Sequence, residues 1–174
     1  MVEKVHFGNI AKQIIYWKPK PGQIPENFAL FCLESILRGL NFAHEQSHLH
    51  KNLLPSNIWL CKSDQMILKI GQFGVKKTLG NNNFYRSPEE CANLPLDSKS
   101  EIFQVGCIIH EMLTGKIVWM KGIDPQSDDN QPEIVDGRIQ HSVQEKLPLT
   151  VSRNLRYLIY LMLQKDPTRR PSIK

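Results

Sequence analysis

The sequence predicts a mainly α-helical domain that carries one small β-hairpin, and three observations lead to this prediction. Several stretches repeat apolar residues at the helical spacings of three and four. Only two short apolar runs have the character of strands, and a polar turn separates them. The chain has 174 residues, which suits one domain and buries enough surface for a core without disulfide bonds. We therefore expect a single α-dominated unit with a small sheet.

The composition is that of an ordinary globular protein. Hydrophobic residues make up 41% of the sequence and charged residues 22%, which excludes disordered, fibrous and disulfide-scaffold proteins. The net charge is +5, but the basic residues are spread along the chain, so neither nucleic acid nor a membrane is an expected partner. No apolar run is long enough to span a membrane, and no signal peptide opens the chain. We expect an intracellular, cytoplasmic protein whose 4 scattered cysteines are reduced and mostly buried.

The first part of the chain predicts two helices joined by a loop. Residues 1–24 give weak signals, with a short helix at Ile10–Trp17 and a Pro- and Gly-containing loop at Lys18–Gln23. A long helix begins at Pro25, because proline is pre-organised for the first helical position, and it runs to about Gln46. Its apolar stripe consists of Ala29, Leu33, Ile36, Leu40 and Ala43. We expect this helix to be buried nearly all round, because other apolar residues lie outside the stripe. These are Phe28, Phe31 and Leu37.

The middle of the chain predicts the hairpin and two irregular regions. Residues 57–60 and 66–70 are the expected strands, and the polar residues between them form the turn. Residues 71–90 are expected to be irregular. Residues 116–150 are polar and loop-rich, with a short helix near Glu133.

Two further helices are expected in the second half. Ser98 and Glu101 form a capping-box pattern that opens a second apolar helix, and Gly115 closes it. The last helix starts at Ser152 and stops before Asp166, which precedes a proline.

A series of short segments follows the long helix in a specific order. They are His50-Lys51-Asn52-Leu53-Leu54-Pro55-Ser56-Asn57, Gly71-Gln72-Phe73-Gly74, Ser87-Pro88-Glu89, Glu101-Ile102-Phe103-Gln104-Val105-Gly106 and Asp166-Pro167-Thr168-Arg169-Arg170-Pro171. In this order they resemble the motifs of the C-terminal lobe of eukaryotic protein kinases, namely H-R-D-x-x-x-x-N, D-F-G, A-P-E, D-x-W-x-x-G and D-P-x-x-R-P. The segment 57–60 (Asn-Ile-Trp-Leu) most resembles the NIMA-related branch of serine/threonine kinases. The resemblance covers residues 25–174, and it implies that residues 1–24 follow an N-terminal lobe that is absent.

The residues that carry the chemistry of the family differ in this sequence. The catalytic-loop Asp accepts the proton of the substrate hydroxyl, but its position holds Asn52, and a neutral amide cannot take a proton. The loop Lys that contacts the transferring phosphate aligns with Leu54, and the D-F-G Asp that holds Mg²⁺ aligns with Gln72. Only Asn57 matches a metal ligand of the family. We expect neither catalysis nor a metal site, and we count these positions as degenerate, together with His50, Lys51, Phe73 and Gly74.

The part of the family's fold that grips the nucleotide phosphates has no counterpart in the sequence. No G-x-G-x-x-G motif follows a strand, and no strand lysine of the V-A-I-K type is present. The segment Val75–Arg86 is shorter than the corresponding activation segment of the family. Lys51 replaces the Arg that pairs with the phosphate of that segment. Thr78 and Tyr85 remain as candidate phosphorylation sites there.

Other positions imply that the architecture is kept. Glu89 and Arg170 align with a buried ion pair that ties the end of the activation segment to the last helices. Glu101 takes the place of the Asp that anchors the catalytic-loop backbone, although the capping box accounts for it almost as well. His50 and Phe73 align with members of a hydrophobic spine, and we expect His50 to be a packed structural residue.

The sequence leads to three functional hypotheses. The first is a pseudokinase, a kinase-like fold that serves regulation or scaffolding without a cofactor. The second is a truncated form of a serine/threonine kinase with ATP-dependent protein phosphorylation. The third is a residual ATP binder over Trp59, which aligns with the residue beneath the adenine, although a core or interface aromatic is the simpler interpretation.

The face around Ile58, Trp59 and Leu60 is the expected partner site. Without an N-terminal lobe this apolar surface should be partly open. We therefore expect either that residues 1–24 cap it or that a protein partner binds it.

Overall fold

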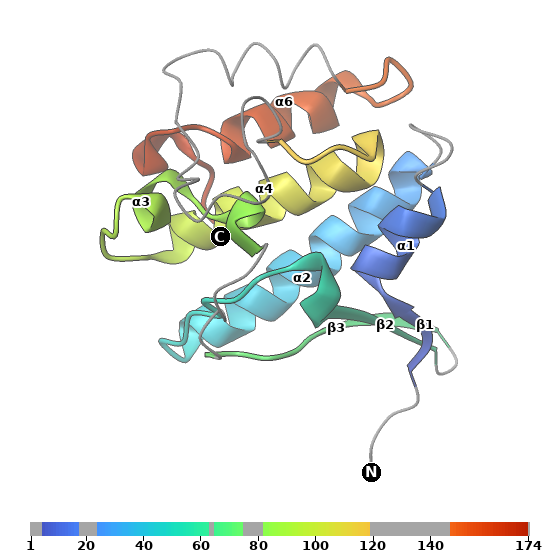
Figure 1. Ribbon diagram of the computed structural model, residues 1–174, viewed down its shortest axis with the longest axis horizontal. Coiled ribbons are helices and arrows are strands. Elements are labelled where there is room, and N and C mark those ends of the chain that lie inside the picture. The colour runs from blue at the N-terminus through green and yellow to red at the C-terminus, as the bar shows by residue number, and fades with distance from the viewer. Residues whose placement is uncertain (1–4, 18–23, 63–64, 75–81, 119–146, 174) are drawn as a thin grey trace.

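Helices and a small sheet form successive layers in the computed structural model (Figure 1). Helix α6 (Arg153–Met162) packs on α4 (Ser98–Thr114), α4 packs on α2 (Glu26–Glu45), and α2 covers the sheet. The structure describes residues 5–17, 24–62, 65–74, 82–118 and 147–173. Among the helices of these residues, none is long and apolar enough to cross a membrane.

The sheet is antiparallel with the strand order β1-β2-β3. Strands β2 (Ile58–Lys62) and β3 (Met66–Ile70) pair in unbroken register and confirm the predicted hairpin. Strand β1 (Val5–Asn9) was not predicted, so the sheet is larger than the expected hairpin. Val5 and Phe7 alternate with His6, but this run is short and ends at Gly8, which has a positive φ of 76°. β1 is a strand because it pairs with the edge of β2. This partner is distant in the sequence, so the local pattern does not indicate the pairing.

Helix α1 (Ile10–Trp17) has the predicted bounds, and it is part of the main core. Asn9 caps it, because the Asn9 Oδ1 accepts a hydrogen bond from the Lys12 N–H at 3.0 Å. Ile10 and Ile14 are buried in the same cluster as the stripe of α2. Residues on either side of position 24 therefore share one core.

Helix α2 confirms the predicted stripe but is not buried all round. It starts at Glu26, one residue later than expected, with Pro25 just outside it. The stripe residues are buried, whereas Phe42 is 69% exposed and Leu30 is 40% exposed. The expectation of burial on every face is wrong because α4 and β3 cover only part of the helix surface.

The start of α4 differs from the predicted capping box. Asp97, not Ser98, is the N-cap, and its carboxylate accepts hydrogen bonds from the N–H groups of Lys99 (2.9 Å) and Ser100 (3.0 Å). The Ser100 side chain completes the box by accepting from the Asp97 N–H at 3.2 Å. The end of the helix is as predicted, with Gly115 in the left-handed conformation.

Helix α6 begins after the N-cap Ser152, as predicted. It approaches α4 closely at Gly106, where an added Cβ would lie 3.0 Å from the Met162 Cβ. A side chain at this position would crowd Met162 and Leu163 and require them to shift.

The region expected to be irregular contains two short helices. These are η2 (Asn82–Tyr85), a 3₁₀ helix, and α3 (Pro88–Cys91). The helix predicted near Glu133 lies outside the described residues. All the cysteines are free, and Cys32, Cys61 and Cys107 are buried as predicted.

Candidate functional site

The loop of residues 50–57 connects α2 to β2, and Glu101 of α4 holds its backbone. The Glu101 Oε1 accepts a hydrogen bond from the Lys51 N–H at 2.9 Å, and its Oε2 accepts one from the His44 Nε2 at 2.6 Å. Lys51 has a φ of 61°, which is unfavourable for a residue with a side chain. The Glu101 carboxylate thus fixes a strained turn. It occupies the anchoring position that the resemblance implies and takes no part in the capping box of α4.

His50 is a buried hub of this loop. Its Nδ1 accepts a hydrogen bond from the Asn52 N–H at 3.2 Å, so its Nε2 carries the proton and donates to the Gly71 carbonyl at 2.9 Å. The ring lies 4.2 Å from the Phe73 ring, centroid to centroid. Because both nitrogens are engaged in a neutral ring, His50 stabilises the loop and is not placed to transfer a proton.

Three uncharged residues occupy the centre of the loop. Asn52 is 5% exposed, and its Oδ1 is buried without a hydrogen-bond partner in the part of the chain that the structure describes. Leu54 is also buried and presents no polar atom. The Asn57 Nδ2 donates to the Asn52 carbonyl at 2.8 Å, and its neutral amide oxygen accepts from the Ser56 hydroxyl at 3.4 Å.

The segment Gly71–Gly74 is attached to the loop through its backbone. The Gly71 N–H donates to the Asn57 carbonyl at 2.8 Å, and the Gly74 N–H donates to the His50 carbonyl at 3.0 Å. Between them, Gln72 has a left-handed φ of 62° and an exposed side chain. Phe73 contacts His50 but remains 42% exposed, so it is only partly enclosed as a spine residue.

The face expected to be open is only partly exposed. Ile58 is 0% exposed and Leu60 is 1% exposed, and Trp59 is half-buried. Strand β1 pairs along β2, with Asn9 opposite Trp59. Ile58 and Leu60 are therefore part of the core, and Trp59 alone of the three stays partly exposed, so this face is less open than expected. The N-terminal segment lies beside β2 in the sheet, and a protein partner at this face stays a prediction. The Trp59 indole also lies against Gly71, 3.8 Å from where a Cβ would stand.

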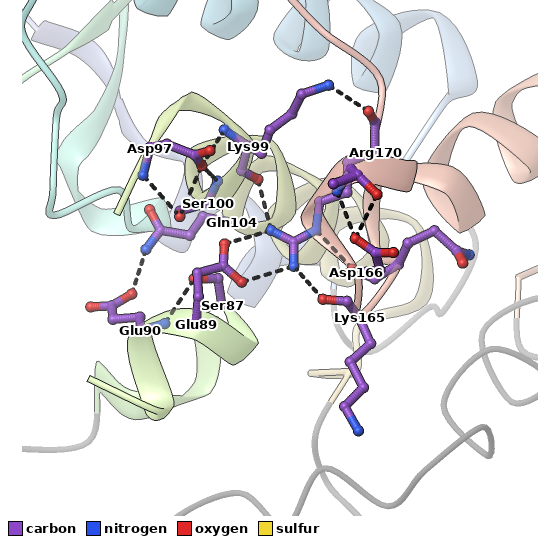
Figure 2. A network of polar contacts seen from close by, with 12 residues as sticks. Ser87, Glu89, Glu90, Asp97, Lys99, Ser100, Gln104, Lys165, Asp166 and Arg170 are labelled. Atoms are coloured by element: carbon purple, nitrogen blue, oxygen red, sulfur yellow. Dashed lines mark hydrogen bonds and ion pairs between the residues drawn. The ribbon is translucent and has the colours of Figure 1, made fainter. Parts of the chain in front are cut away.

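Arg170 lies at the centre of a buried polar network near the end of the chain (Figure 2). Its guanidinium binds both oxygens of the Glu89 carboxylate, at 2.6 and 2.9 Å. Its remaining N–H groups donate to backbone carbonyls, which belong to Gln164, Lys99 and Lys165. The charged group also lies 4.9 Å from the centre of the Phe103 ring. The pair therefore joins α3 to α4 and to the segment that follows α6.

The ionisation of Glu89 follows from this network. Burial by itself raises the pKa of Glu89, but hydrogen bonds from Arg170 and Ser100 outweigh it, so the pKa lies below its usual value of 4.5. Glu89 is thus a carboxylate at neutral pH and forms a charged, bidentate pair. Breaking such a buried pair by removing one partner costs about 3–5 kcal/mol.

Tyr85 is held against α4 and is a poor target for phosphorylation in this conformation. Its hydroxyl donates to the Glu111 Oε2 at 2.5 Å. Burial raises the pKa of the Tyr85 phenol well above its usual range, and the neighbouring Glu111 carboxylate raises it further. The other candidate, Thr78, lies outside the described residues.

Hydrogen bonds thus connect the motifs found in the sequence. The whole chain, residues 1–174, matches the family model of the protein kinase domain. The chain belongs to the protein kinase family. This match confirms the family assignment that the order of the motifs predicts.

The kinase domain is similar to several NIMA-related kinases, as predicted. Mouse serine/threonine-protein kinase Nek4 is 29% identical over 170 residues, which cover 90% of this chain and 20% of Nek4. Serine/threonine-protein kinase nekl-2 of Caenorhabditis elegans is 30% identical over 158 residues, covering 86% of this chain and 42% of nekl-2. Rice Nek3 is 36% identical over 149 residues, covering 80% of this chain and 24% of Nek3. The chain therefore spans less than half the length of these relatives.

The Mg²⁺ that accompanies ATP in protein kinases does not fit the residues of this kinase domain. Mg²⁺ prefers carboxylate oxygens, whereas the two aligned positions hold Asn57 and the exposed Gln72. Within the described ranges, no group of three or more His, Cys, Asp or Glu side chains is placed to hold a metal ion. The donor set at these two positions therefore disagrees with the metal chemistry of the family.

The sequence did not predict two residues, Asn9 and His44, that support the loop of residues 50–57. Asn9 reaches it from the start of α1, where its Nδ2 donates to the Ser56 carbonyl at 3.0 Å. His44 holds Glu101 from the last turn of α2. The polar His44 inside an apolar helical stretch was an available signal. No local sequence signal indicated the Asn9 contact, because its partner Ser56 lies 47 residues away.

Proposed function

We propose that this chain is a pseudokinase domain that serves as a regulatory or scaffolding module and does not transfer phosphate. The observation that carries the proposal is the combination of Asn52, Leu54 and Gln72 in a loop whose backbone is otherwise firmly anchored. Each side chain is neutral at a position where the family needs a base, a cation or a metal ligand. The hydrogen bonds that anchor the loop backbone are present, whereas the charged side chains of the family are replaced by neutral ones at these three positions.

The size of the expected loss supports this proposal. Removing a general base alone lowers a rate by roughly 10² to 10⁴. Electrostatic stabilisation and metal positioning are further large contributions to phosphoryl transfer, and the aligned positions that would supply them hold the neutral residues Leu54 and Gln72. The preserved Glu101 and Glu89–Arg170 contacts are the kind of structure that a binding module still needs.

A phosphate-transfer assay tests the proposal. The purified chain is incubated with labelled ATP, Mg²⁺ or Mn²⁺ and a general protein substrate, and we expect no transfer above background. The Asn57→Ala variant is the matched control, because it removes the only aligned metal ligand. Metal-dependent transfer that this substitution abolishes contradicts the proposal.

A second candidate is a shortened form of an active serine/threonine kinase that consists mainly of the C-terminal lobe. The names of the relatives favour it, since they are serine/threonine-protein kinases. An upstream coding segment with a glycine-rich loop and a strand lysine would support this form. The substitutions at Asn52 and Gln72 would remain in it, which is why we rank it second.

We also propose that the chain acts without ATP, in the cytoplasm, and through a protein partner. Residual ATP binding over Trp59 is the competing possibility, because this ring is half-buried rather than enclosed. A thermal shift of several degrees with millimolar ATP and no metal would favour the nucleotide. The absence of such a shift would favour the proposal.

A further inference from the structure

Asn9 lies at the junction of β1 and α1, where one side chain makes two different contacts. Its Oδ1 caps α1 through the Lys12 N–H, and its Nδ2 donates to the Ser56 carbonyl, both at 3.0 Å. Asn9 is 9% exposed, so these bonds are largely shielded from water. The same residue lies opposite Trp59 in the sheet. Asn9 is thus the point at which the N-terminal segment joins the 50–57 loop.

The rest of β1 is held less regularly than the other strands. Its pairs are Val5 with Cys61 and Asn9 with Trp59, so the register shifts between them. Gly8, with a φ of 76°, lies within this irregular stretch. Strands β2 and β3, in contrast, pair residue by residue over their full length. Asn9 is thus the position at which β1 returns to a paired register with β2 after this irregularity.

We infer that residues 5–17, here called the strap, form one conformational unit that the Asn9–Ser56 hydrogen bond locks against the edge of β2. When this bond breaks, the strap opens and frees the backbone edge of β2, the strand that carries Ile58, Trp59 and Leu60. Ile10 and Ile14 pack into the core, so the closed strap is the resting state and opening is a local, sub-global event. The inference goes beyond the proposed function, because it holds whether or not the chain transfers phosphate.

Two substitutions at Asn9 separate the lock from the helix cap. Asn9→Asp keeps a capping oxygen but replaces the amide donor with a carboxylate that faces the Ser56 carbonyl. Asn9→Ala removes both bonds. Lys12→Ala is the matched control, because Lys12 contributes its backbone N–H to the cap and its side chain is exposed.

Hydrogen exchange measured by mass spectrometry tests the inference. In Asn9→Asp we expect the amides of the strap and of β2 to exchange together, about five- to tenfold faster than in the wild type. Exchange in the centre of α4 should not change, which shows that the fold is intact. Lys12→Ala should match the wild type. Wild-type exchange of β2 in Asn9→Asp overturns the inference.

A measurement on the wild type keeps the test decisive if the variants do not fold. In low urea, the amides of α1 and those of β2 that face β1 should open with the same dependence on urea, before those of α4. Opening of α1 that leaves β2 protected overturns the inference, because the strap would then not be a single unit.

Discussion

Arg170 satisfies every N–H of its guanidinium, although its side chain is 0% exposed. A buried charge is tolerated only when it is paired and fully hydrogen-bonded, and the planar fork of Arg supplies five donors in fixed directions. The acceptors come from three separate segments of the chain. The residue therefore positions backbone as much as it neutralises Glu89.

Arg170→Lys should destabilise the protein strongly although it keeps the charge. Lys has three donors, so several of the acceptors lose their partner, and each buried unsatisfied group costs about 1–3 kcal/mol. We expect the free energy of unfolding, measured in urea, to fall by about 2–5 kcal/mol. Arg169→Lys is the control, because that side chain is 72% exposed and its replacement should change stability by less than about 0.5 kcal/mol. Equal effects of the two substitutions contradict the role given to Arg170.

Glu89 should make the protein sensitive to acid. Its pKa is lowered in the folded state, so the unfolded state binds the proton more readily. The stabilisation is therefore complete above the usual pKa of 4.5 and is lost as the pH falls through the lower folded value. We expect the Tm of the wild type to fall more steeply below that pH than the Tm of Glu89→Gln. Parallel curves would contradict the pairing, and an NMR titration of the wild-type carboxyl provides the same test if the variant is too unstable.

At the scale of elements, the neighbours Asp97 and Ser98 are both candidates for the N-cap of α4, and substitution of each by Ala distinguishes them. Asp97→Ala removes the acceptor of two N–H groups and should cost about 0.5–2 kcal/mol in urea unfolding. Ser98→Ala should change stability by less than about 0.5 kcal/mol, because Ser98 is the first residue inside the helix. The reverse order of effects would restore the capping box that the sequence predicts. The sequence pattern alone could not identify the N-cap, since Asp and Ser are both favourable N-cap residues and the two positions are adjacent.

The elements that the sequence predicted well are those with a local signal. The stripe of α2, the hairpin and the Gly115 stop each arise from residues within a few positions of one another. Strand β1 depends on the edge of β2, which is distant in the sequence, and its own pattern is broken by Gly8. The prediction that the outer face of α2 is buried was wrong for a related reason. Burial of that face depends on which neighbouring elements cover the helix.

The candidate site shows the same division. The motifs located the loop, the Glu89–Arg170 pair and the anchoring Glu101, because the order of short segments is itself a specific signal. The contacts of Asn9 and His44 were not predicted, since their partners lie 47 and 57 residues away. Residue types in a motif can be read locally, but the side chains that support them from other elements cannot.

Across the whole molecule, polar contacts between distant segments hold the layers together. Glu101 connects α4 to α2 and to the loop, Arg170 connects the end of the chain to α3, and Glu26 accepts from the Ser152 N–H at 2.8 Å to join α2 to α6. The substitutions at Asn52, Leu54 and Gln72 are not part of these connections. Neutral residues at these positions are therefore compatible with the fold.

This separation predicts that one substitution can restore metal binding without restoring catalysis. Gln72 is exposed and follows Gly71, whose N–H donates to the Asn57 carbonyl, so Gln72→Asp adds a carboxylate at the second aligned metal position at little cost to the fold. We expect Mn²⁺ binding with a Kd of roughly 1 mM, equivalent to about −4 kcal/mol, measured by electron paramagnetic resonance. The wild type and the control Gln65→Asp should not bind, and adding Asn57→Ala to Gln72→Asp should abolish binding. Phosphate transfer should stay absent, because Asn52 and Leu54 still supply neither base nor cation. Equal binding by the wild type would show that carboxylates elsewhere hold the metal and would contradict the account of Gln72.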